Sequence, residues 1–423
     1  MPLDLWTDLK WRGLITDSTK PHELHEHLLR GPCAAYVGFD PTADSLHVGS
    51  LLPLLVLRRV QLAGHRPIVL IGGGTGLIGD PSGRTGERQL HPEEQVAEAA
   101  ARLKEQVKRF VDFEAGAVLV DNYEWLSNLQ VIPFLRDVGK HFPLGAMMAK
   151  ESVRSRMGRS EEGISYTEFS YQVLQAYDFM ALFDRYGCTL QLGGSDQWGN
   201  ITAGIELIRR VKGEAAYGIT LPLVMKTDGS KFGKSETGTV WLDAGKTSPY
   251  EMFQFWLNTA DDDVVSYLKY FTFLEPGEID DLHGVTQRSP DRREAQRVLA
   301  RHVTALVHGE SAMEEAEAIS RALFSGDVEA LTEPQLAQAC RAMPSTMLAR
   351  EEAARLPVID LLTRVGLAAS KREGRDLLSA GAISINGQKV TSVDGVISRD
   401  TARFGHFIVI RKGKKSYHAA ILP

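Results

Sequence analysis

The sequence predicts an α/β protein, with a parallel-sheet domain over residues 1–248 followed by an all-α domain and a small α+β domain. Three observations lead to this fold class. Apolar, strand-like runs alternate with helical stretches up to about residue 248, which is typical of parallel βαβ units. Helical patterns then replace strands over 249–325. Alternating strands return only in 356–423, after an ambiguous stretch at 326–355 that is expected to be a linker.

The elements of the first domain follow from apolar runs and their flanking residues. The first strand is expected at 33–39, and the next helix begins near 48–50, because Pro53 fits the first turn of a helix. Later strands are predicted, in chain order, at 66–73, 118–122, 188–194 and 219–225. Further helices are predicted at 92–111, 165–186 and 197–212. The last domain is expected to hold two short helices before its strands.

Composition excludes several classes of protein. Hydrophobic residues make up 43% of the chain and charged residues 24%, which is ordinary for a globular protein and excludes wholesale disorder. No apolar run approaches the ~20 residues of a membrane-spanning helix, and the first residues lack the pattern of a secretory signal. The three cysteines, Cys33, Cys188 and Cys340, are too far apart for a metal or disulfide pattern, which favours a cytoplasmic protein.

Charge is unevenly distributed along the chain. The formal net charge is −6, yet residues 360–423 carry 11 lysines and arginines against 5 acidic residues. That segment is therefore at +6 and the rest of the chain at −12. A basic end on an acidic body indicates local binding of a polyanion such as RNA, with a merely solvated basic surface as the alternative. The cations expected at RNA phosphates are Lys371, Arg372, Arg375, Lys389, Lys412, Lys414 and Lys415.

The turn after the first strand, GFDPTADSLHVGS at 38–50, combines several features of a nucleotide site. Open α/β sheets bind ligands at the carboxyl ends of their strands, and helix N-termini attract phosphate. Gly49 lets a flat ring or a phosphate press against backbone, and His47 can donate to a phosphate oxygen. A histidine that only caps the helix is the alternative interpretation.

Two other glycine-containing segments are weaker on their own. IGGGTGLIGDPSGR at 71–84 follows a strand, but it has neither the Lys-Ser/Thr end of a Walker loop nor the spacing of a dinucleotide fingerprint. It is therefore either a ligand-approach loop or a tightly packed turn. KFGKS at 231–235 sets two lysines three residues apart, which suits a polyphosphate whose charge shifts during reaction. Exposed loops of this composition are also common.

Polar residues on the predicted helix 165–186 indicate a recognition pocket. Tyr171, Gln175 and Asp178 stand at i, i+4 and i+7, so they share one face of an otherwise apolar helix. Buried polar groups need partners, so this face meets either an amphipathic ligand or solvent. In LGGSDQWGN at 192–200, Asp196 follows a strand, where a carboxylate can hold ribose hydroxyls or cap a helix.

A cluster of three histidines, His22, His25 and His27, invites a metal interpretation. Their spacing does not place all three on one face of a helix, and no cysteine or carboxylate partner is evident. We therefore expect no metal site in this chain.

These segments, taken together and in order, resemble the bacterial tyrosyl-tRNA synthetases, a family of class I aminoacyl-tRNA synthetases. The resemblance covers essentially the whole chain and rests on YVGFDPTADSLHVGS, GGGTGLIGDPSGR, YQVLQAYDF and LQLGGSDQWGNITAG. HVGS at 47–50 is similar to the family's His-Ile-Gly-His signature, and KFGKS to its Lys-Met-Ser-Lys-Ser signature. The resemblance implies a Rossmann-type catalytic domain, a helical anticodon-side domain and an S4-like RNA-binding domain.

The sequence departs from these signatures at three positions. Ser50 replaces the second signature histidine; it is shorter but can still donate a hydrogen bond to a ribose oxygen. Phe232 and Gly233 replace the signature's methionine and first serine. Both lysines, Lys231 and Lys234, are retained, so the argument for a phosphate clamp stands.

The resemblance implies a two-step reaction. The tyrosine carboxylate attacks the α-phosphate of ATP, and the terminal adenosine of the tRNA then attacks the adenylate. Because a carboxylate is already ionised at neutral pH, catalysis is expected to consist of positioning and charge stabilisation. Mg²⁺ is expected to bind through the phosphates, since no acidic cage for it is evident. No tightly bound cofactor and no editing domain are expected.

The resemblance also implies a role for each matching residue. The catalytic set, which contacts the triphosphate, is Thr42, His47, Arg84, Arg88, Lys231 and Lys234. The tyrosine set is Tyr36, Asp80, Tyr171, Gln175, Asp178 and Gln191, with Tyr36 and Asp178 at the phenol hydroxyl. The further ATP contacts are Gly38, Asp40, Gly49, Ser50, Gly194, Asp196, Gln197, Lys234 and Ser235.

A homodimer is implied as well, through the apolar insert near 125–165. Two alternatives remain open. One is the tryptophan-specific sister enzyme, against which Tyr36 and Asp178 argue because they suit a phenol better than an indole. The other is a non-catalytic RNA-binding derivative, such as a splicing helper, against which the retained lysine pair argues.

Overall fold

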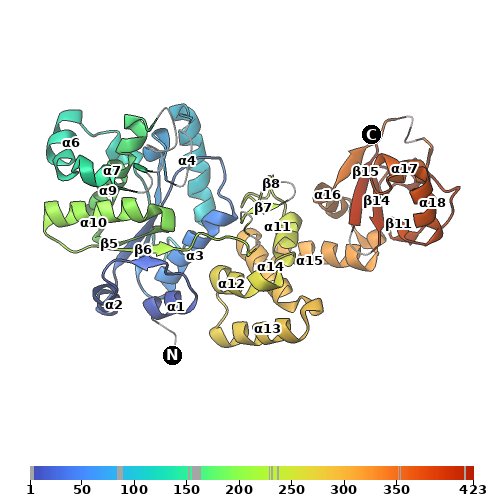
Figure 1. Ribbon diagram of the computed structural model, residues 1–423, viewed down its shortest axis with the longest axis horizontal. Coiled ribbons are helices and arrows are strands. Elements are labelled where there is room, and N and C mark those ends of the chain that lie inside the picture. The colour runs from blue at the N-terminus through green and yellow to red at the C-terminus, as the bar shows by residue number, and fades with distance from the viewer. Residues whose placement is uncertain are drawn as a thin grey trace. The chain divides into compact units, whose positions relative to one another are not determined.

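The computed structural model describes residues 4–82, 89–150, 153–154, 163–227, 229, 232–235, 238–350, 352, 354–413 and 416–423. The chain forms two compact units. The first comprises residues up to 234 together with 238–243 and 260–288, and the second comprises 235–237, 244–259 and 289–423. Figure 1 labels the elements of both.

A six-stranded sheet forms the centre of the first unit. Its strands are β1 (Asp17–Ser18), β2 (Ala34–Phe39), β3 (Arg66–Ile71), β4 (Val118–Asp121), β5 (Cys188–Gly194) and β6 (Tyr217–Leu221). The order is β1-β6-β5-β2-β3-β4, and all neighbours are parallel except β1 and β6. From β2 the chain adds β3 and β4 on one side, and β5 and β6 lie on the other side. The strand order therefore reverses between β2 and β5, and ligands of open α/β sheets bind in a crevice at the carboxyl ends of such a strand pair.

The helices of the first unit connect and flank these strands. The longer ones are α1 (Leu5–Trp11), α2 (Pro21–Leu29), α3 (Val48–Leu62), α4 (Glu93–Val107), α9 (Tyr166–Tyr186) and α10 (Trp198–Lys212). Shorter turns are η1 (Thr75–Leu77), α5 (Tyr123–Leu126), α6 (Val131–Asp137), η2 (Gly139–His141), α7 (Leu144–Met148) and η3 (Ser195–Gln197). The predicted parallel sheet with intervening helices is confirmed.

The structure differs from the sequence prediction at two places in this unit. The short strand β1, which pairs with β6, was not predicted, because two polar residues carry no strand pattern. Pro53 is the sixth residue of α3 rather than part of its first turn. The helix continues through it because its neighbours Leu52, Leu54 and Leu55 are fully buried.

Residues 249–325, predicted as one helical domain, are divided between the two units. α12 (Asp261–Phe271) and α13 (Pro276–Arg288) belong with the parallel sheet. α11 (Pro249–Leu257), η4 (Pro290–Arg292), α14 (Glu294–His308) and α15 (Glu310–Ser325) belong to the second unit. The compact division therefore falls inside the predicted helical domain, because side chains of α1 and α3 bond the backbone of α12.

The second unit also contains a five-stranded sheet of order β12-β11-β14-β15-β9. Its strands are β9 (Ser345–Met347), β11 (Ile383–Ile385), β12 (Gln388–Lys389), β14 (Phe407–Lys412) and β15 (Ser416–Ile421). They are accompanied by η5 (Val328–Ala330), α16 (Glu333–Arg341), α17 (Val358–Arg364), α18 (Lys371–Ser379), η6 (Arg399–Thr401) and the pair β10 (Leu356–Pro357) and β13 (Val396–Ile397).

The segment 326–355, predicted as a linker, contains regular structure. It holds α16 and also β9, which pairs with β15 in parallel. Only three residues of this strand are regular, so its pattern is too short to see in the sequence. Within the part of the chain that the structure describes, no helix is long and apolar enough to cross a membrane.

Candidate active site

Polar residues collect at the carboxyl ends of the parallel strands. Asp40 directly follows β2, Thr75 opens η1 after β3, and Asn122 directly follows β4. Asp196 lies in η3, directly after β5. Carboxyl ends of parallel strands lie along one edge of a sheet, so these side chains face a common region, in which the following hydrogen bonds connect several of them.

A buried network is centred on Asp178 of α9. Asn122 Nδ2 donates to Asp178 Oδ2 at 2.9 Å, and Trp125 Nε1 donates to Asp178 Oδ1 at 2.7 Å. The same Asn122 amide donates to Thr75 Oγ1 at 2.9 Å, while its oxygen accepts the backbone N–H of Gly74 at 2.8 Å. The network therefore connects α9, the end of β4 and the turn after β3.

The network continues to Asp40, which lies in the turn 38–50 that is predicted to bind a nucleotide. Thr75 Oγ1 donates to Asp40 Oδ1 at 2.7 Å, and the Tyr171 hydroxyl donates to Asp40 Oδ2 at 2.7 Å. A Cβ atom on Gly72 would lie 2.0 Å from Asp40 Oδ1, so only glycine fits there. Burial together with the Asp40 charge raises the pKa of Tyr171 well above its usual value. Tyr171 therefore stays a hydrogen-bond donor.

Two buried polar atoms next to this network have no hydrogen-bond partner among the described residues. They are the hydroxyl of Tyr36 and the side-chain oxygen of Gln191. The two residues are direct neighbours on the adjacent parallel strands β2 and β5, so both side chains lie on the same face of the sheet. The ring of Tyr36 packs against the ring of Phe179 in α9, with 5.3 Å between the two ring centroids. Because unpaired buried polar atoms are costly and rare, this pair indicates the binding place of a polar ligand group.

The pKa shift of Tyr36 shows that its hydroxyl lies near the carboxyl group of Asp178. The pKa of Tyr36 is raised well above its usual value by burial first and by the charge of Asp178 second. Burial raises the pKa of Asp178 to about 8, although its bonds to Asn122 and Trp125 work in the opposite direction. The negative charges of Asp40 and Asp121 add to the rise.

A second layer of amide bonds adjoins the first. Gln197 Nε2 donates to Asp80 Oδ2 at 2.7 Å, and Gln175 Nε2 donates to Gln197 Oε1 at 3.2 Å. Asn200 Nδ2 donates to Gln175 Oε1 at 3.0 Å, and Asp80 Oδ1 accepts the backbone N–H of Ser82 at 2.9 Å. This layer brings Asp80 and Gln175 of the predicted tyrosine set together with Gln197 of the predicted ATP set.

His47 is the N-cap residue of α3. Its Nδ1 accepts the backbone N–H of Gly49 at 3.0 Å, which assigns the proton to Nε2 and leaves that atom available as a donor. The Trp241 ring meets the imidazole edge-on, with 6.3 Å between the ring centroids. His47 keeps an exposed surface, and partial desolvation of its ring lowers the pKa of His47. His47 is therefore neutral at pH 7. Thr42 is exposed, and the Ser50 N–H donates to the His47 carbonyl at 2.8 Å.

Gly233, in the second signature, lies against Val48 at the first signature. A Cβ atom on Gly233 would lie 3.1 Å from Val48 Cγ2, so the loop backbone touches the first turn of α3. The Val48 N–H donates to the Val240 carbonyl at 3.0 Å, which fixes the returning strand of the loop there. The ring of Phe232 stacks on Phe271 of α12 at 5.4 Å, with 13° between the planes.

Some predicted residues fall where no side-chain statement applies. Arg84, Arg88, Lys231, Lys414 and Lys415 lie outside the described residues. Lys234 and Ser235 form the short strand β7 (Lys234–Ser235), which pairs with β8 (Gly238–Thr239), and only their backbone is described. The phosphate clamp by Lys231 and Lys234 therefore stays a prediction.

The predicted ribose end is more open. Gly38 is the one exposed residue of β2, and a Cβ there would meet only Leu70 at an ordinary 3.5 Å. A Cβ on Gly194 would lie 2.5 Å from Asp196 Oδ1, so a larger residue there would displace that carboxyl group. Desolvation raises the pKa of Asp196, and the Asp80 charge contributes.

The sequence analysis missed the residues that position the network. Asn122 and Trp125 belong to none of the motifs described above, whereas Thr75 and Asn200 lie in the segments 71–84 and 192–200 but were given no role there. One signal was present for Asn122, because it ends the predicted strand 118–122 at the same sheet edge as Asp40. Trp125 had no such signal, since its contact depends on how the helix after β4 folds back.

The basic residues of the last domain differ in their availability. Arg372, Arg375 and Lys389 are exposed. Lys371 pairs with Asp360 at 2.6 Å, and Lys412 donates to Glu373 at 3.1 Å and to the Leu367 carbonyl. Arg372 and Arg375 of α18, together with Lys389, are therefore the predicted RNA contacts whose side chains are exposed and for which no ion pair is described.

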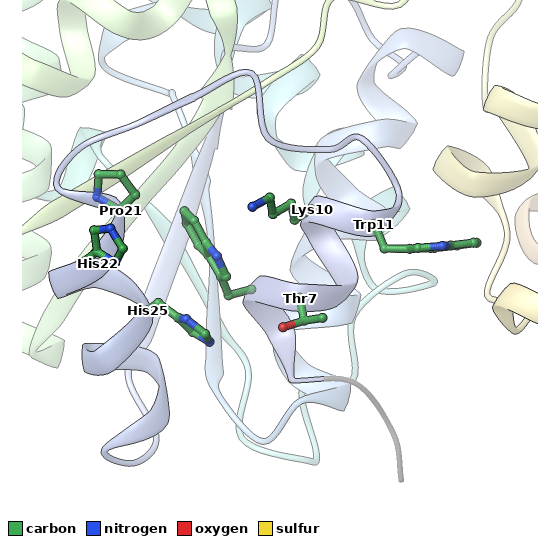
Figure 2. Close-up of a pocket in the computed structure, with 7 residues that line it drawn as sticks. Thr7, Lys10, Trp11, Pro21, His22 and His25 are labelled. Atoms are coloured by element: carbon green, nitrogen blue, oxygen red, sulfur yellow. The ribbon is translucent and has the colours of Figure 1, made fainter.

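A pocket of about 610 Å³ lies between α1 and α2, lined by Trp6, Thr7, Lys10, Trp11, Pro21, His22 and His25. Figure 2 shows Lys10 and His22 on opposite walls, with Trp11 extending away from both histidines. His27 is instead bonded to Thr189 at 2.8 Å. Over the described ranges, no three His, Cys, Asp or Glu side chains are grouped so that they could hold a metal ion.

Known proteins resemble this chain in sequence and in fold. Residues 29–325 match the family described as tRNA synthetases class I (W and Y), and 335–420 match the tyrosine–tRNA ligase SYY-like C-terminal domain. A tyrosine–tRNA ligase of Geobacillus kaustophilus is 53% identical over 420 residues, covering 98% of this chain and 99% of the relative. One of Aliivibrio fischeri is 52% identical over 422 residues, covering 99% and 98%.

Solved structures agree with these relatives. A C-terminally truncated mitochondrial tyrosyl-tRNA synthetase of Aspergillus nidulans superposes with a TM-score of 0.70 at 31% identity, covering 76% of this chain and 95% of that one. The fold and the crevice thus define a class I aminoacyl-tRNA synthetase, which is an enzyme. The chain belongs to the class I family that contains the tryptophan- and tyrosine-specific enzymes.

The raised pKa of Asp178 gives a pH-dependent stability. From about pH 4 to pH 8 the folded protein holds a proton on Asp178 that the unfolded chain has lost, so stability falls as pH rises through this window. Asp178→Asn removes the titration. We expect the free energy of unfolding of the wild type to fall relative to Asp178→Asn by about 1 kcal/mol for each pH unit.

Urea unfolding followed by fluorescence at several pH values between about 5 and 8 measures this difference. Asp184→Asn on the same helix is the control, because Asp184 is exposed and pairs with Lys212 at the surface. If the free energy of unfolding changes with pH in the same way for Asp178→Asn and the wild type, folding does not raise the pKa of Asp178 and the prediction is wrong.

Proposed function

We propose that this chain is a tyrosine–tRNA ligase. It activates L-tyrosine with ATP to give tyrosyl-adenylate and pyrophosphate, and then transfers the tyrosyl group to the 3′-terminal adenosine of its tRNA. The family membership and the relatives, which carry that name over nearly the full chain, support this assignment.

The single observation that carries the choice of tyrosine is the polar end of the buried pocket. Tyr36 and Gln191 carry polar atoms without a partner among the described residues, and Asp178 lies beside Tyr36. A phenol hydroxyl both donates and accepts, so it can pair with this set, whereas the indole N–H of tryptophan only donates. A ligand without a polar end would leave the set unpaired, at a cost in binding energy.

The ammonium end of tyrosine is assigned to the second layer. Asp80, Tyr171 and Gln175 offer acceptors, and Asp80 is already oriented by its bond from Gln197. These residues lie on the same helix as Asp178 or are bonded to it through Gln197 and Asn200. The spacing between the two layers then sets the length of the amino acid.

The nucleotide is assigned to the rim formed by the α3 turn. Thr42 and the His47 Nε2–H would contact the γ-phosphate side, Gly38 and Gly49 would face the nucleotide, and Asp196 would hold the ribose. Arg84, Arg88, Lys231 and Lys234 would hold the leaving pyrophosphate, with Mg²⁺ carried on the phosphates. The tyrosine carboxylate is the nucleophile, so no general base is required and rate enhancement comes from alignment and charge stabilisation.

The tRNA is assigned in part to the exposed cations of α18. Their positive charge, on a chain that is otherwise acidic, is suited to phosphate contacts. We place the activity in the cytoplasm, which is consistent with three buried, unpaired cysteines.

A homodimer is proposed through α6 and α7. Both helices present large apolar side chains to solvent, with Val131 at 69%, Ile132 at 73% and Leu144 at 65% exposure. An apolar patch of this kind is typical of a protein–protein interface. A twofold axis there would pair the patch with its own copy.

Pyrophosphate exchange into ATP tests the function directly. We expect exchange with tyrosine but not with tryptophan. Asp178→Ala is expected to raise the KM for tyrosine by at least a hundredfold while the KM for ATP changes less than threefold, because Asp178 faces the phenol end. A variant that keeps its tyrosine affinity would rule out this placement, and a wild type without tyrosine-dependent exchange would rule out the function.

Neutralising Arg372→Gln and Arg375→Gln together tests the RNA surface. We expect tRNA charging to weaken, and the salt dependence of tRNA affinity to decrease by roughly one to two units of slope, since about two phosphate contacts are lost. Exchange without tRNA is expected to be unchanged. Arg30→Gln at the C-cap of α2 is the control, because Arg30 is also exposed and pairs with Glu26. Equal effects of the two changes would refute a specific contact.

Equilibrium sedimentation tests the dimer. The wild type is expected to sediment at about twice the chain mass of 46.6 kDa, and Ile132→Asp at the mass of one chain. Leu62→Asp, which charges another exposed leucine on α3, is expected to leave the dimer intact. A wild type that is monomeric at micromolar concentration is incompatible with the proposal.

A further inference from the structure

A buried cluster of three charged side chains lies where α1 and α3 meet the end of α12. Arg12 Nε donates to Asp8 Oδ1 at 2.7 Å, and Arg59 Nη1 donates to Asp8 Oδ2 at 3.3 Å. Both guanidinium groups are almost fully buried, at 4% and 5% exposure. Two cations therefore share one carboxylate, which leaves one positive charge to be balanced by other groups.

The balancing groups are backbone carbonyls at the C-terminal end of α12. Arg12 Nη1 donates to the Lys269 carbonyl at 3.2 Å and Arg12 Nη2 to the Leu274 carbonyl at 2.8 Å. Arg59 Nη2 donates to the Thr272 carbonyl, and its guanidinium lies over the Phe273 ring at 4.6 Å. A helix C-terminus carries partial negative charge, so it compensates the excess cation. The cluster thus fixes α12 to the catalytic sheet unit through its last turn.

The other contacts of α12 reach the segment that leads into the signature loop 231–235. Asp263 accepts the backbone N–H of Thr227 at 3.0 Å, and the Tyr267 hydroxyl donates to the Met225 carbonyl at 3.4 Å. Phe232 lies between Tyr267 and Phe271, with its ring centroid 5.2 Å and 5.4 Å from theirs. α12 therefore supports Met225, Thr227 and Phe232.

Arg59 also belongs to the helix whose first turn the loop touches. α3 carries His47 and Gly49 at its beginning and Arg59 near its end. The loop is thus held from two sides, by the start of α3 through Gly233 and by α12 through Phe232. Arg59 connects these two supports, because it bonds α12 from α3.

We propose that Asp8, Arg12 and Arg59 are positioning residues for ATP activation: they hold α12 where its aromatic face sets the signature loop against the nucleotide turn. This rests on the proposed function for the identity of the reaction. The proposed tyrosine site is built from β2, β5, α9 and the turns after β3 and β4, and among the bonds of its described residues none involves α12. The cluster therefore acts on the phosphate end of the reaction and not on tyrosine binding.

The test is Arg59→Met in the full-length chain, assayed by tyrosine-dependent pyrophosphate exchange. Methionine replaces the apolar stem of the arginine without its guanidinium group, which leaves the Asp8–Arg12 pair neutral. We expect kcat to fall about tenfold with the KM for tyrosine within twofold of the wild type, because misplaced phosphate contacts slow the chemical step. Arg59→Lys, which can still donate one bond to the Thr272 carbonyl, is expected to recover part of kcat.

The matched control is Arg58→Met, the neighbouring arginine of α3, which donates to Gln61 at 2.6 Å. It is expected to leave kcat within twofold of the wild type. An equal loss in Arg58→Met, or a loss below twofold in Arg59→Met, overturns the proposal while leaving the proposed function intact. A wild type without exchange overturns the function itself.

A double-mutant cycle separates positioning from general destabilisation. If Arg59 acts through α12 and the Phe232–Phe271 stack, the losses of kcat from Arg59→Met and Phe271→Leu are less than multiplicative in the double variant. Multiplicative losses mean that the two sites act independently and refute the proposal. Should Arg59→Met not fold, the same cycle with Arg59→Lys decides the question, with thermal unfolding of each variant as the check.

Discussion

The buried carboxyl group of Asp178 is the constraint on which the site depends. A carboxyl group without solvent needs hydrogen-bond partners, and Asn122 and Trp125 supply donors to it. Asn122 also donates to Thr75 and accepts from the Gly74 N–H, so a single amide connects α9 to the turns after β3 and β4. The polar interior thus holds the crevice in shape before any ligand arrives, because every alternative arrangement leaves a buried group unpaired.

The two ends of the crevice are supported in different ways. The proposed tyrosine end is a network of side-chain bonds between elements that already pack as a core. The proposed nucleotide end consists of backbone, at Gly49 and Gly233, and of Phe232, which the aromatic face of α12 supports. A preformed pocket favours selective binding of a small substrate. A loop resting on a separately anchored helix can adjust to the changing charge of a triphosphate without disturbing that pocket.

The sequence predicts the parallel sheet well because strands such as β2 and β3 are continuous apolar runs between glycines and polar turns. It names candidate site residues where a motif contains them, as at His47 or Asp178, and their roles stay predictions. It does not predict Asn122 or Trp125, because their importance lies in a contact between segments about 55 residues apart. For the same reason it does not predict that α12 separates from α11, since charged bonds from Arg12 and Arg59 determine that division.

Under the proposed function, selectivity for tyrosine follows from two unpaired polar atoms. Tyr36 and Gln191 are buried with polar atoms that have no partner among the described residues, and such atoms are costly to leave unpaired. A phenol hydroxyl would pair with them, whereas phenylalanine would leave them unpaired. On this proposal the site needs no steric exclusion of the smaller ring. Asn122 and Trp125 each bond one oxygen of Asp178, so the orientation of that carboxyl group beside Tyr36 is set by its own neighbours.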